Sequence, residues 1–240
     1  MRVLAIIPSR YGSSRFPGKP LIDLAGKSMI RRVYEGVLES SMVSKIIVAT
    51  DDQRIFDEVL SFQGSVAMTS KTHSNGTGRC IELAEKNLEY DLVINVQGDE
   101  PLIESSQLDL LINAFSDPLV EIASLASAIV SKDDIVNENR VKVVLDQNND
   151  ALYFSRSVIP NNAKAATDMT FFKHIGIYAF RRSTLLETSD MAPCALELSE
   201  SLEQLRWMYY GKKIRIVKTS TETPNIDTPE DVAKVLKMLK

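Results

Sequence analysis

Short runs of apolar, β-branched residues alternate along this chain with longer segments whose apolar residues recur every three or four positions. The short runs predict buried strands, and the longer periodicity predicts amphipathic helices. Over the first 115 residues this pattern predicts four consecutive strand and helix pairs. Such alternation indicates an α/β protein with a mainly parallel sheet flanked by helices. The expected strands are 3–7, 46–50, 65–69 and 92–96, and the expected helices lie near 29–38, 55–60, 77–88 and 108–115.

The second half alternates less regularly. Thr228, Pro229 and the acids Glu230 and Asp231 form a strong helix start, because Pro suits the first helical position and acids suit the first turn. Ser28 is expected to cap the first helix and Gly64 to end the second. No internal repeat or flexible linker interrupts the chain, so we expect one domain over residues 1–240. The expected strands are 121–130, 141–146, 151–155, 174–180 and 214–217, and the expected helices are 182–188, 196–210 and one from residue 229.

Composition limits the class of partner. The 28 Lys and Arg against 32 Asp and Glu give a formal net charge of −4, so no global positive field attracts nucleic acid or anionic lipid. Only Cys80 and Cys194 occur, with two histidines, which argues against a disulfide framework or a zinc site. No apolar stretch approaches the length of about 20 residues that a membrane span needs. We therefore expect a cytoplasmic protein with no nucleic-acid partner and no membrane insertion.

The loop after the first predicted strand contains candidate phosphate-binding residues. Residues 9–19 hold three cations, two glycines and several hydroxyls, but no acid. Backbone N–H groups and cationic side chains in such a loop suit phosphate oxygens. The loop is not a Walker loop, because five residues separate Gly12 from Gly18 and Pro20 stands where a Ser or Thr would bind magnesium. The alternative is a basic, solvated turn.

Two acids stand at the ends of predicted elements. Asp99 follows Gln97 and Gly98 directly after the fourth strand, and Asp227 precedes the last helix. Carboxylates are the hard oxygen ligands that Mg²⁺ takes when it is bound to a polyphosphate. Each acid also has a purely structural interpretation, Asp99 as a turn residue and Asp227 as an acid favoured by the helix dipole. Together with the basic loop they favour metal-assisted nucleotide chemistry.

A second candidate site lies in the second half. The period of two along strand 174–180 places His174, Gly176 and Tyr178 on one face, which suggests the wall of a site. Glu203 and Gln204 suit hydrogen bonds to a polyol. The alternatives are a structural histidine and the solvated side of an amphipathic helix. Trp207 is interpreted as a core or interface residue.

Taken together, these segments resemble the 3-deoxy-manno-octulosonate (KDO) cytidylyltransferases, also called CMP-KDO synthetases, of the sugar nucleotidyltransferase superfamily. The resemblance spans nearly the whole chain. The first loop is shared by several sugar cytidylyltransferases, whereas Tyr-Phe-Ser-Arg at 153–156 with His-Ile-Gly-Ile-Tyr at 174–178 narrows it to the KDO branch. The matching segments are 7–20, 48–52, 95–102, 151–156, 174–178, 200–206 and 227–231.

The resemblance implies a Rossmann-like domain with a smaller sugar-side subregion that also makes a homodimer. It implies that CTP reacts with an eight-carbon 3-deoxy sugar acid to give the CMP-sugar and pyrophosphate, for lipopolysaccharide precursor synthesis. Arg10, Lys19, Asp99 and Asp227 would be catalytic, and the two acids would bind Mg²⁺. By position, Ser9, Arg10, Ser13, Lys19, Arg79 and Gln97 would bind the nucleotide, and Arg156, His174, Tyr178, Glu203 and Gln204 would face the sugar acid.

The chain departs from the family pattern at two places. Gly78 stands where the family usually has an acid in Ser-Gly-Thr-Asp-Arg, and 161–164 replaces an aromatic residue and a segment with Arg or Asp. Both departures concern the sugar side, so an 8-amino-3,8-dideoxy substrate is the near alternative. A nucleotide-sugar glycosyltransferase and a non-catalytic nucleotide-binding paralogue are the more distant alternatives.

Overall fold

A computed structural model describes residues 1–12, 16–161, 169–221, 223–226 and 228–239. The contacts divide the chain into two compact units. Unit 1 comprises Met1–Asp109 and Thr223–Lys240, and unit 2 comprises Leu110–Glu222. The expectation of one domain over residues 1–240 stays a prediction.

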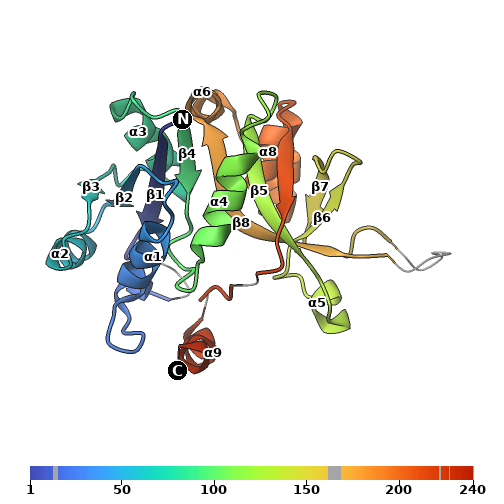
Figure 1. The fold of residues 1–240 in the computed structure, drawn as a ribbon. Coiled ribbons are helices and arrows are strands. Elements are labelled where there is room, and N and C mark those ends of the chain that lie inside the picture. The colour runs from blue at the N-terminus through green and yellow to red at the C-terminus, as the bar shows by residue number, and fades with distance from the viewer. Residues whose placement is uncertain (13–15, 162–168, 222, 227, 240) are drawn as a thin grey trace. The chain divides into compact units, whose positions relative to one another are not determined.

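Unit 1 contains a parallel sheet in which β1 (Val3–Ser9) lies between β2 (Lys45–Thr50) and β4 (Leu92–Asn95) (Figure 1). The short strand β3 (Val66–Met68) pairs with the outer side of β2. The order β3-β2-β1-β4 therefore reverses at β1, because the chain moves outward to β3 and then returns to the other side of β1. In open α/β sheets ligands bind beyond the carboxyl ends of the strands at such a reversal.

The helices of unit 1 confirm the predicted alternation. They are α1 (Met29–Leu38), α2 (Gln53–Ser61), α3 (Gly76–Lys86) and the C-terminal α9 (Pro229–Met238), with a 3₁₀ turn at Lys19–Leu21. Ser28 caps α1 as predicted, since its hydroxyl accepts from the Arg31 N–H at 3.3 Å. At the start of α9, the Thr228 N–H donates to Asp231 at 3.1 Å. Helix α4 (Ser105–Ala114) contains the boundary between the units.

The predicted end of α2 is wrong in one detail. The left-handed residue is Gln63, with φ 62°, and not Gly64. The Gly64 N–H donates to Val59 O and the Gln63 N–H to Leu60 O, both at 2.9 Å, which is the hydrogen-bond pattern of a Schellman end. Gly64 is needed for space instead, because a Cβ there would lie 2.5 Å from the Phe62 ring.

Unit 2 is built around β5 (Ile122–Ala128). Strand β9 (Ile214–Lys218) pairs with it in parallel, and β8 (Phe172–Arg181) pairs with it in antiparallel orientation. The antiparallel hairpin of β6 (Lys142–Leu145) and β7 (Ala151–Ser155) adds to the beginning of β8. The mainly parallel sheet expected from the alternation thus describes unit 1, whereas most strand pairs of unit 2 are antiparallel.

Two features of the helices in unit 2 differ from the sequence prediction. The single helix expected over 196–210 is divided into α7 (Ala195–Glu200) and α8 (Gln204–Tyr209), because Ser201 takes a left-handed conformation with φ 52°. The short helix α5 (Lys132–Val136) was not predicted. Helix α6 (Arg182–Glu187) lies where a helix was expected, and a 3₁₀ turn at Thr188–Asp190 follows it.

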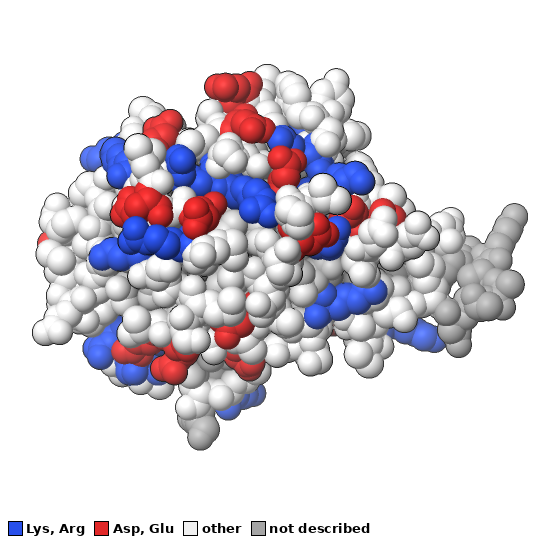
Figure 2. Space-filling view, turned by 45° about the horizontal axis from the view of Figure 1, so that its top comes forward, with Lys and Arg blue, Asp and Glu red and all other residues white. Residues whose placement is uncertain are grey.

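The surface carries charges of both signs. On the face shown in Figure 2, Lys and Arg side chains lie beside Asp and Glu side chains, which accords with the small net charge. Among the described residues, no helix is long and apolar enough to cross a membrane.

Candidate active site

The first group of candidate residues gathers where β1 and β4 end, at the reversal of strand order in unit 1. Ser9 is the last residue of β1, and Gln97, Gly98 and Asp99 follow β4 after one intervening residue. A Cβ on Gly98 would lie 2.8 Å from both Pro8 O and Ser9 Oγ. The backbone after β4 therefore passes directly against the end of β1, and only glycine leaves room for this approach.

Lys19 and Asp99 form an ion pair at this edge. Lys19 Nζ donates to Asp99 Oδ2 at 2.8 Å and to the carbonyl oxygen of Ile226 at 2.7 Å. The Ile226 N–H in turn donates to the carbonyl oxygen of Asp99 at 2.9 Å. Ile226 is fully buried in an apolar cluster with Leu24 and Met29, so its carbonyl is held in place. The structure thus brings together the loop after β1, the turn after β4 and the segment before α9.

The remaining nucleotide-side candidates occupy different environments. Ser9 is 3 % exposed, and its hydroxyl has no hydrogen-bond partner among the described residues. A buried hydroxyl without a partner is costly unless a ligand or water satisfies it, which suits a binding role. Arg10 is exposed and Gln97 is partly buried. Ser13 and Asp227 lie outside the described residues.

Arg79 is held by protein groups. Its guanidinium donates to Asp51 at 2.8 Å, to the Thr69 hydroxyl at 2.6 Å and to the Ser70 carbonyl at 3.1 Å, and the side chain is 3 % exposed. Asp51 follows β2 and Thr69 follows β3, so Arg79 on α3 ties the ends of these two strands together. Contact of Arg79 with a base or ribose stays a prediction, and Asp51 is a partner that the sequence analysis did not single out.

The departure at Gly78 has a local physical reason. A Cβ at this position would lie 2.8 Å from His73 Nδ1 and 3.4 Å from Asn75 Oδ1. His73 is fixed there by a 2.7 Å contact between its Nε2 and Glu82, and Asn75 caps α3 by accepting from the Gly78 N–H at 2.9 Å. An acid at residue 78 would have to displace His73.

The second group of candidates lies in unit 2 among aromatic rings. His174 and Tyr178 occupy the same face of β8, as the period of two predicts, with ring centroids 5.3 Å apart. Phe154 packs edge-on against His174 at 5.0 Å, and Trp207 packs edge-on against Tyr178 at 5.0 Å. Trp207 is 1 % exposed, which confirms its interpretation as a core residue.

Burial changes the protonation of both polar rings. It lowers the pKa of His174 to about 3, so the imidazole is neutral at pH 7. Burial, with the charge of Glu203 as a second cause, raises the pKa of Tyr178 well above its usual value, so the phenol keeps its proton. The buried Tyr178 hydroxyl has no hydrogen-bond partner among the described residues. Gln204 is 5 % exposed and begins α8 beside Glu203, so it does not lie on a solvated helix face.

Arg156 is anchored to the break between α7 and α8. Its Nε donates to the carbonyl of Glu200 at 2.8 Å, and a terminal nitrogen donates to the carbonyl of Ser201 at 3.4 Å. The Glu200 carboxylate accepts from the Ser155 hydroxyl at 2.6 Å and from the Arg156 N–H at 2.9 Å. Lys142, fully buried at the start of β6, donates to the Arg156 carbonyl at 2.5 Å. Neither Glu200 nor Lys142 was assigned a role from sequence, because their partners are distant along the chain.

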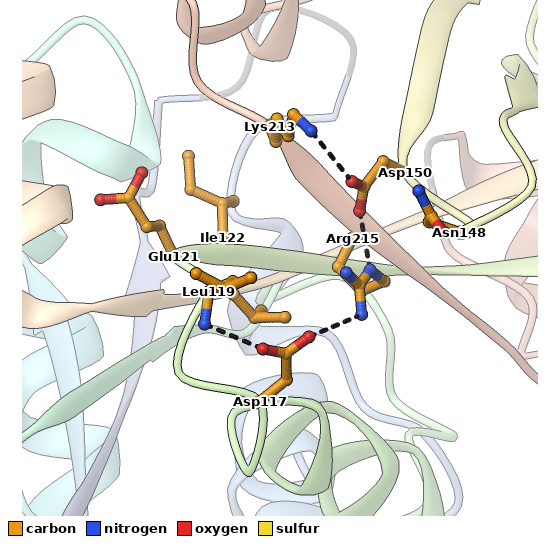
Figure 3. A pocket seen from close by; sticks show the side chains of 9 residues that line it. Asp117, Leu119, Glu121, Ile122, Asn148, Asp150, Lys213 and Arg215 are labelled. Carbon is orange, nitrogen blue, oxygen red and sulfur yellow. Dashed lines mark hydrogen bonds and ion pairs between the residues drawn. The ribbon is translucent and has the colours of Figure 1, made fainter.

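A groove of about 400 Å³ in unit 2 holds none of these candidates (Figure 3). Four of its charged side chains bond to one another, with Arg215 bridging Asp150 at 2.7 Å and Asp117 at 3.5 Å, and Lys213 lying 3.8 Å from Asp150, whereas the fifth, Glu121, pairs with Lys212 outside the lining. These ion pairs explain why charged residues line the groove without a ligand-binding role.

Among the described residues, no three His, Cys, Asp or Glu side chains converge as a metal site would require. Asp99 nevertheless has the right chemistry for a hard cation, because only Oδ2 of its carboxylate is engaged by a described residue. Mg²⁺ on a polyphosphate needs only one or two protein carboxylates, so the donor set fits that ion.

Comparison with known proteins identifies the family. A model of the cytidylyltransferase family matches residues 4–214. Curated proteins named 3-deoxy-manno-octulosonate cytidylyltransferase are 48 % identical in Parabacteroides distasonis and 49 % identical in Porphyromonas gingivalis, covering 100 % and 99 % of this chain and 98 % and 96 % of the relatives. The chain belongs to the 3-deoxy-manno-octulosonate cytidylyltransferase family. The resemblance drawn from the sequence motifs is thereby confirmed.

Solved structures extend the comparison to the fold. A CMP:2-keto-3-deoxy-manno-octonic acid synthetase complexed with CTP matches with a TM-score of 0.95 and 42 % identity, covering 100 % of this chain and 98 % of that one. A 4-diphosphocytidyl-2C-methyl-D-erythritol synthase from Anaerococcus prevotii matches with a TM-score of 0.65 at 17 % identity, which shows the fold alone. The predicted α/β, nucleotidyltransferase-type fold of this 3-deoxy-manno-octulosonate cytidylyltransferase family member is confirmed.

Proposed function

We propose that this chain transfers CMP from CTP to 3-deoxy-manno-octulosonate and releases pyrophosphate. The observation that carries the proposal is the pairing of Lys19 with Asp99 at the reversal of strand order. Relatives that match this chain over its full length are named for the same activity. This edge of a parallel sheet is where an α/β protein binds a nucleotide. The solved relative complexed with CTP supports the choice of nucleotide.

On the nucleotide side, the chain supplies positive charge and position. Lys19 is held between a carboxylate and a buried carbonyl, so its ammonium stands at a fixed point from which it neutralises triphosphate charge. Arg10 and Ser13 belong to the same loop and would add a cation and a hydroxyl. The buried Ser9 hydroxyl would gain its missing partner from the bound nucleotide. Gln97 would contact the base or ribose.

On the sugar side, unit 2 supplies a wall with few charges. His174 and Tyr178 present neutral polar groups among aromatic rings, which suits the apolar faces and hydroxyls of a sugar. Glu203 and Gln204 would accept and donate hydrogen bonds to its hydroxyls. Arg156 would supply the positive charge for the sugar carboxylate.

The chemical step is an in-line substitution at phosphorus. The oxygen of the anomeric C2 hydroxyl forms a bond to the α-phosphorus of CTP, the bond from that phosphorus to the bridging oxygen breaks, and pyrophosphate leaves with the electron pair. The hydroxyl proton passes to solvent. Positioning and charge neutralisation supply most of the catalysis in such transfers, so no dedicated side-chain base is required.

We also propose Mg²⁺ as the cofactor, with Asp99 and Asp227 as its protein ligands. When bound, the ion neutralises charge on phosphate oxygens and acidifies the attacking hydroxyl. The open carboxylate oxygen of Asp99 and the anchoring of the neighbouring Ile226 support this choice.

The preferred sugar is the eight-carbon acid with a hydroxyl at C8. The relatives are named for 3-deoxy-manno-octulosonate, so the 8-amino alternative is not favoured. A glycosyltransferase would not release pyrophosphate, and a non-catalytic paralogue would not need to retain Lys19 and both acids. The product would feed lipopolysaccharide precursor synthesis in the cytoplasm.

We further propose a homodimer formed through unit 2. Several apolar side chains of this unit are largely exposed, among them Val136 at 67 %, Leu152 at 60 % and Leu198 at 69 %. The family resemblance implies this dimer, and an interface would remove such side chains from water.

Pyrophosphate release tests the proposed function. The purified chain is incubated with CTP and magnesium, together with 3-deoxy-manno-octulosonate, its 8-amino analogue or a nine-carbon sialic acid, and without any sugar as the control. We expect the highest kcat/KM with 3-deoxy-manno-octulosonate. Preference for the 8-amino acid would overturn the choice of sugar, and turnover of sialic acid alone would overturn the sugar class.

A further inference from the structure

A buried hydroxyl faces the histidine of the proposed sugar site. Ser124, in the middle of β5, is fully buried, and its Oγ lies 2.8 Å from His174 Nε2. The same oxygen lies 3.1 Å from the carbonyl oxygen of Ile175 and 2.9 Å from that of Ile177. The three partners belong to the part of β8 where the pairing with β5 shifts, since Leu125 faces Ile175 but Ser124 faces Tyr178.

The number of available protons decides whether Ser124 Oγ or His174 Nε2 is the donor in this contact. A serine hydroxyl carries one proton and two lone pairs, and a carbonyl oxygen can only accept. If the proton of Ser124 pointed at His174, its lone pairs would face two carbonyl oxygens at hydrogen-bond distance with no proton between them. If the proton points toward the carbonyls, a lone pair of Oγ is left to accept a proton from His174 Nε2. In the second arrangement the two carbonyl oxygens share the single hydroxyl proton and Oγ accepts from His174 Nε2, so neither nitrogen nor oxygen faces Oγ lone pair to lone pair without a proton nearby.

We propose that Ser124 is a positioning residue that fixes His174 in the tautomer protonated at Nε2, so that Nδ1 accepts a hydrogen bond from a hydroxyl of the sugar acid. Nδ1 has no hydrogen-bond partner among the described residues, and the His174 side chain is only partly buried. The rings of Phe154 and Tyr178 pack against the imidazole and limit its rotation. The inference rests on the proposed function for its ligand but not for the tautomer.

According to this assignment, two residues recognise two different groups of the sugar acid, a hydroxyl and the carboxylate. A neutral imidazole with a free lone pair attracts an O–H donor and repels a carboxylate oxygen. His174 therefore recognises a hydroxyl, and the carboxylate falls to a cationic group such as Arg156. Since a site built to accept from a hydroxyl discriminates strongly against a ligand that lacks it, His174 contributes to specificity.

The tautomer can be measured directly, because the chain contains only two histidines. Imidazole ¹⁵N NMR at pH 7 distinguishes protonated from unprotonated ring nitrogens, and His73→Asn assigns the two sets of signals. We expect His174 to be protonated at Nε2 and unprotonated at Nδ1 in the protein without ligands. Protonation at Nδ1, alone or together with Nε2, would overturn the proposal.

A pair of variants tests the role of Ser124. Ser124→Ala removes the acceptor, whereas Ser124→Thr keeps a hydroxyl at the same place. We expect Ser124→Ala to give a mixture of tautomers and to raise KM for the sugar acid about tenfold with KM for CTP unchanged, as loss of one oriented hydrogen bond implies. Ser124→Thr should retain the tautomer and the low KM. A Ser124→Ala protein with unchanged tautomer and unchanged KM would show that Ser124 does not position His174.

The two proposals fail in different ways. A chain that releases no pyrophosphate with any sugar acid would overturn the proposed function, while the NMR spectrum would still decide the tautomer. If Ser124→Ala does not fold, the spectrum of the unmodified protein and the Ser124→Thr kinetics decide the proposal. A proton on Nδ1 in an active enzyme would overturn the inference and leave the function standing.

Discussion

Arg156 and Glu200 are joined by two hydrogen bonds, and Arg156 is the donor in both. The carboxylate of Glu200 accepts from the Arg156 N–H at 2.9 Å, and Nε of Arg156 donates to the Glu200 carbonyl at 2.8 Å. The second oxygen of the carboxylate holds the Ser155 hydroxyl at 2.6 Å. The end of β7 and the end of α7 are thereby fixed to each other, and Arg156 is held at the proposed sugar site.

We expect Glu200→Ala to weaken binding of the sugar acid, because the Ser155 hydroxyl and the Arg156 backbone N–H lose the carboxylate that fixes the end of β7 beneath the Arg156 side chain. KM for 3-deoxy-manno-octulosonate should rise at least tenfold, with KM for CTP within twofold of the unmodified value. Glu200→Gln keeps one oxygen to accept from the Arg156 N–H and places an amide donor beside the Ser155 hydroxyl, which can turn to accept from it, so this variant should recover most of the loss. Steady-state kinetics with each substrate varied separately make the measurement, and an unchanged KM in Glu200→Ala would contradict the anchor.

Lys19→Ala should lower kcat/KM for CTP about a hundredfold, because a fixed ammonium near the triphosphate is lost. The melting temperature should change by only a few degrees, since the side chain packs no core. Lys86→Ala is the matched control, as Lys86 forms a surface ion pair with Glu82 on α3. If Lys19→Ala and Lys86→Ala gave the same kinetics, Lys19 would have no role with phosphate.

Asp99→Asn should reduce turnover at least a hundredfold at saturating magnesium, because an amide neither binds the ion as an anion nor pairs with Lys19. Asp91→Asn serves for comparison, since Asp91 accepts from the exposed backbone N–H of Arg2. Turnover as a function of magnesium concentration provides the readout. Near-normal turnover in Asp99→Asn would remove this carboxylate from the metal site.

Gly98→Ala should destabilise the chain by about 1–3 kcal/mol, because its Cβ would press on the backbone at Pro8 and on Ser9. Gly12→Ala provides the control, since a Cβ there meets nothing within 4 Å. We expect Gly12→Ala to change stability by less than about 0.5 kcal/mol. Urea unfolding of both variants measures the difference, and equal stabilities would show that the close approach at Gly98 is absent.

His174, whose imidazole is packed among aromatic rings, should make the chain less stable in mild acid. Its pKa lies at about 3 in the folded state against about 6.5 when unfolded, so between these values only the unfolded chain binds the proton. Above pH 6.5 neither state binds this proton, so the ring does not change the stability. As the pH falls from 6.5 toward 3, protonation stabilises only the unfolded chain, and the free energy of unfolding falls. From pH 7 to 5.5 the free energy of unfolding should fall about 1 kcal/mol more than in His174→Gln. Equal pH dependence in the two proteins would contradict the lowered pKa of the ring.

Local sequence signals were sufficient for most of the secondary structure. The strand at 151–155 and the helix behind Ser28 occur where the hydrophobic pattern and the cap place them, because these choices depend on neighbouring residues. The break between α7 and α8 was missed for the opposite reason. The apolar period runs through Ser201, but the bonds from Arg156 to the carbonyls of Glu200 and Ser201 come from about 45 residues away.

The antiparallel pairing in unit 2 could not be read from strand patterns either, since alternation shows which residues are buried and not which strand lies alongside. The residue types of the site were visible in the sequence, because each follows a strand end or stands in a motif. Their partners were not: Lys19 meets Ile226, Arg79 meets Asp51 and His174 meets Ser124 across 207, 28 and 50 residues.

The sequence by itself determined the class of the chain, its family and the side chains that can do the chemistry, since composition, periodicity and motif spacing are properties of the chain alone. Only the tertiary structure decided that Arg79 is buried in an ion pair and that His174 lies beside a buried serine with its pKa lowered. Hydrogen-bond partners and pKa values depend on which distant segments meet and how much water they exclude, and folding alone establishes both.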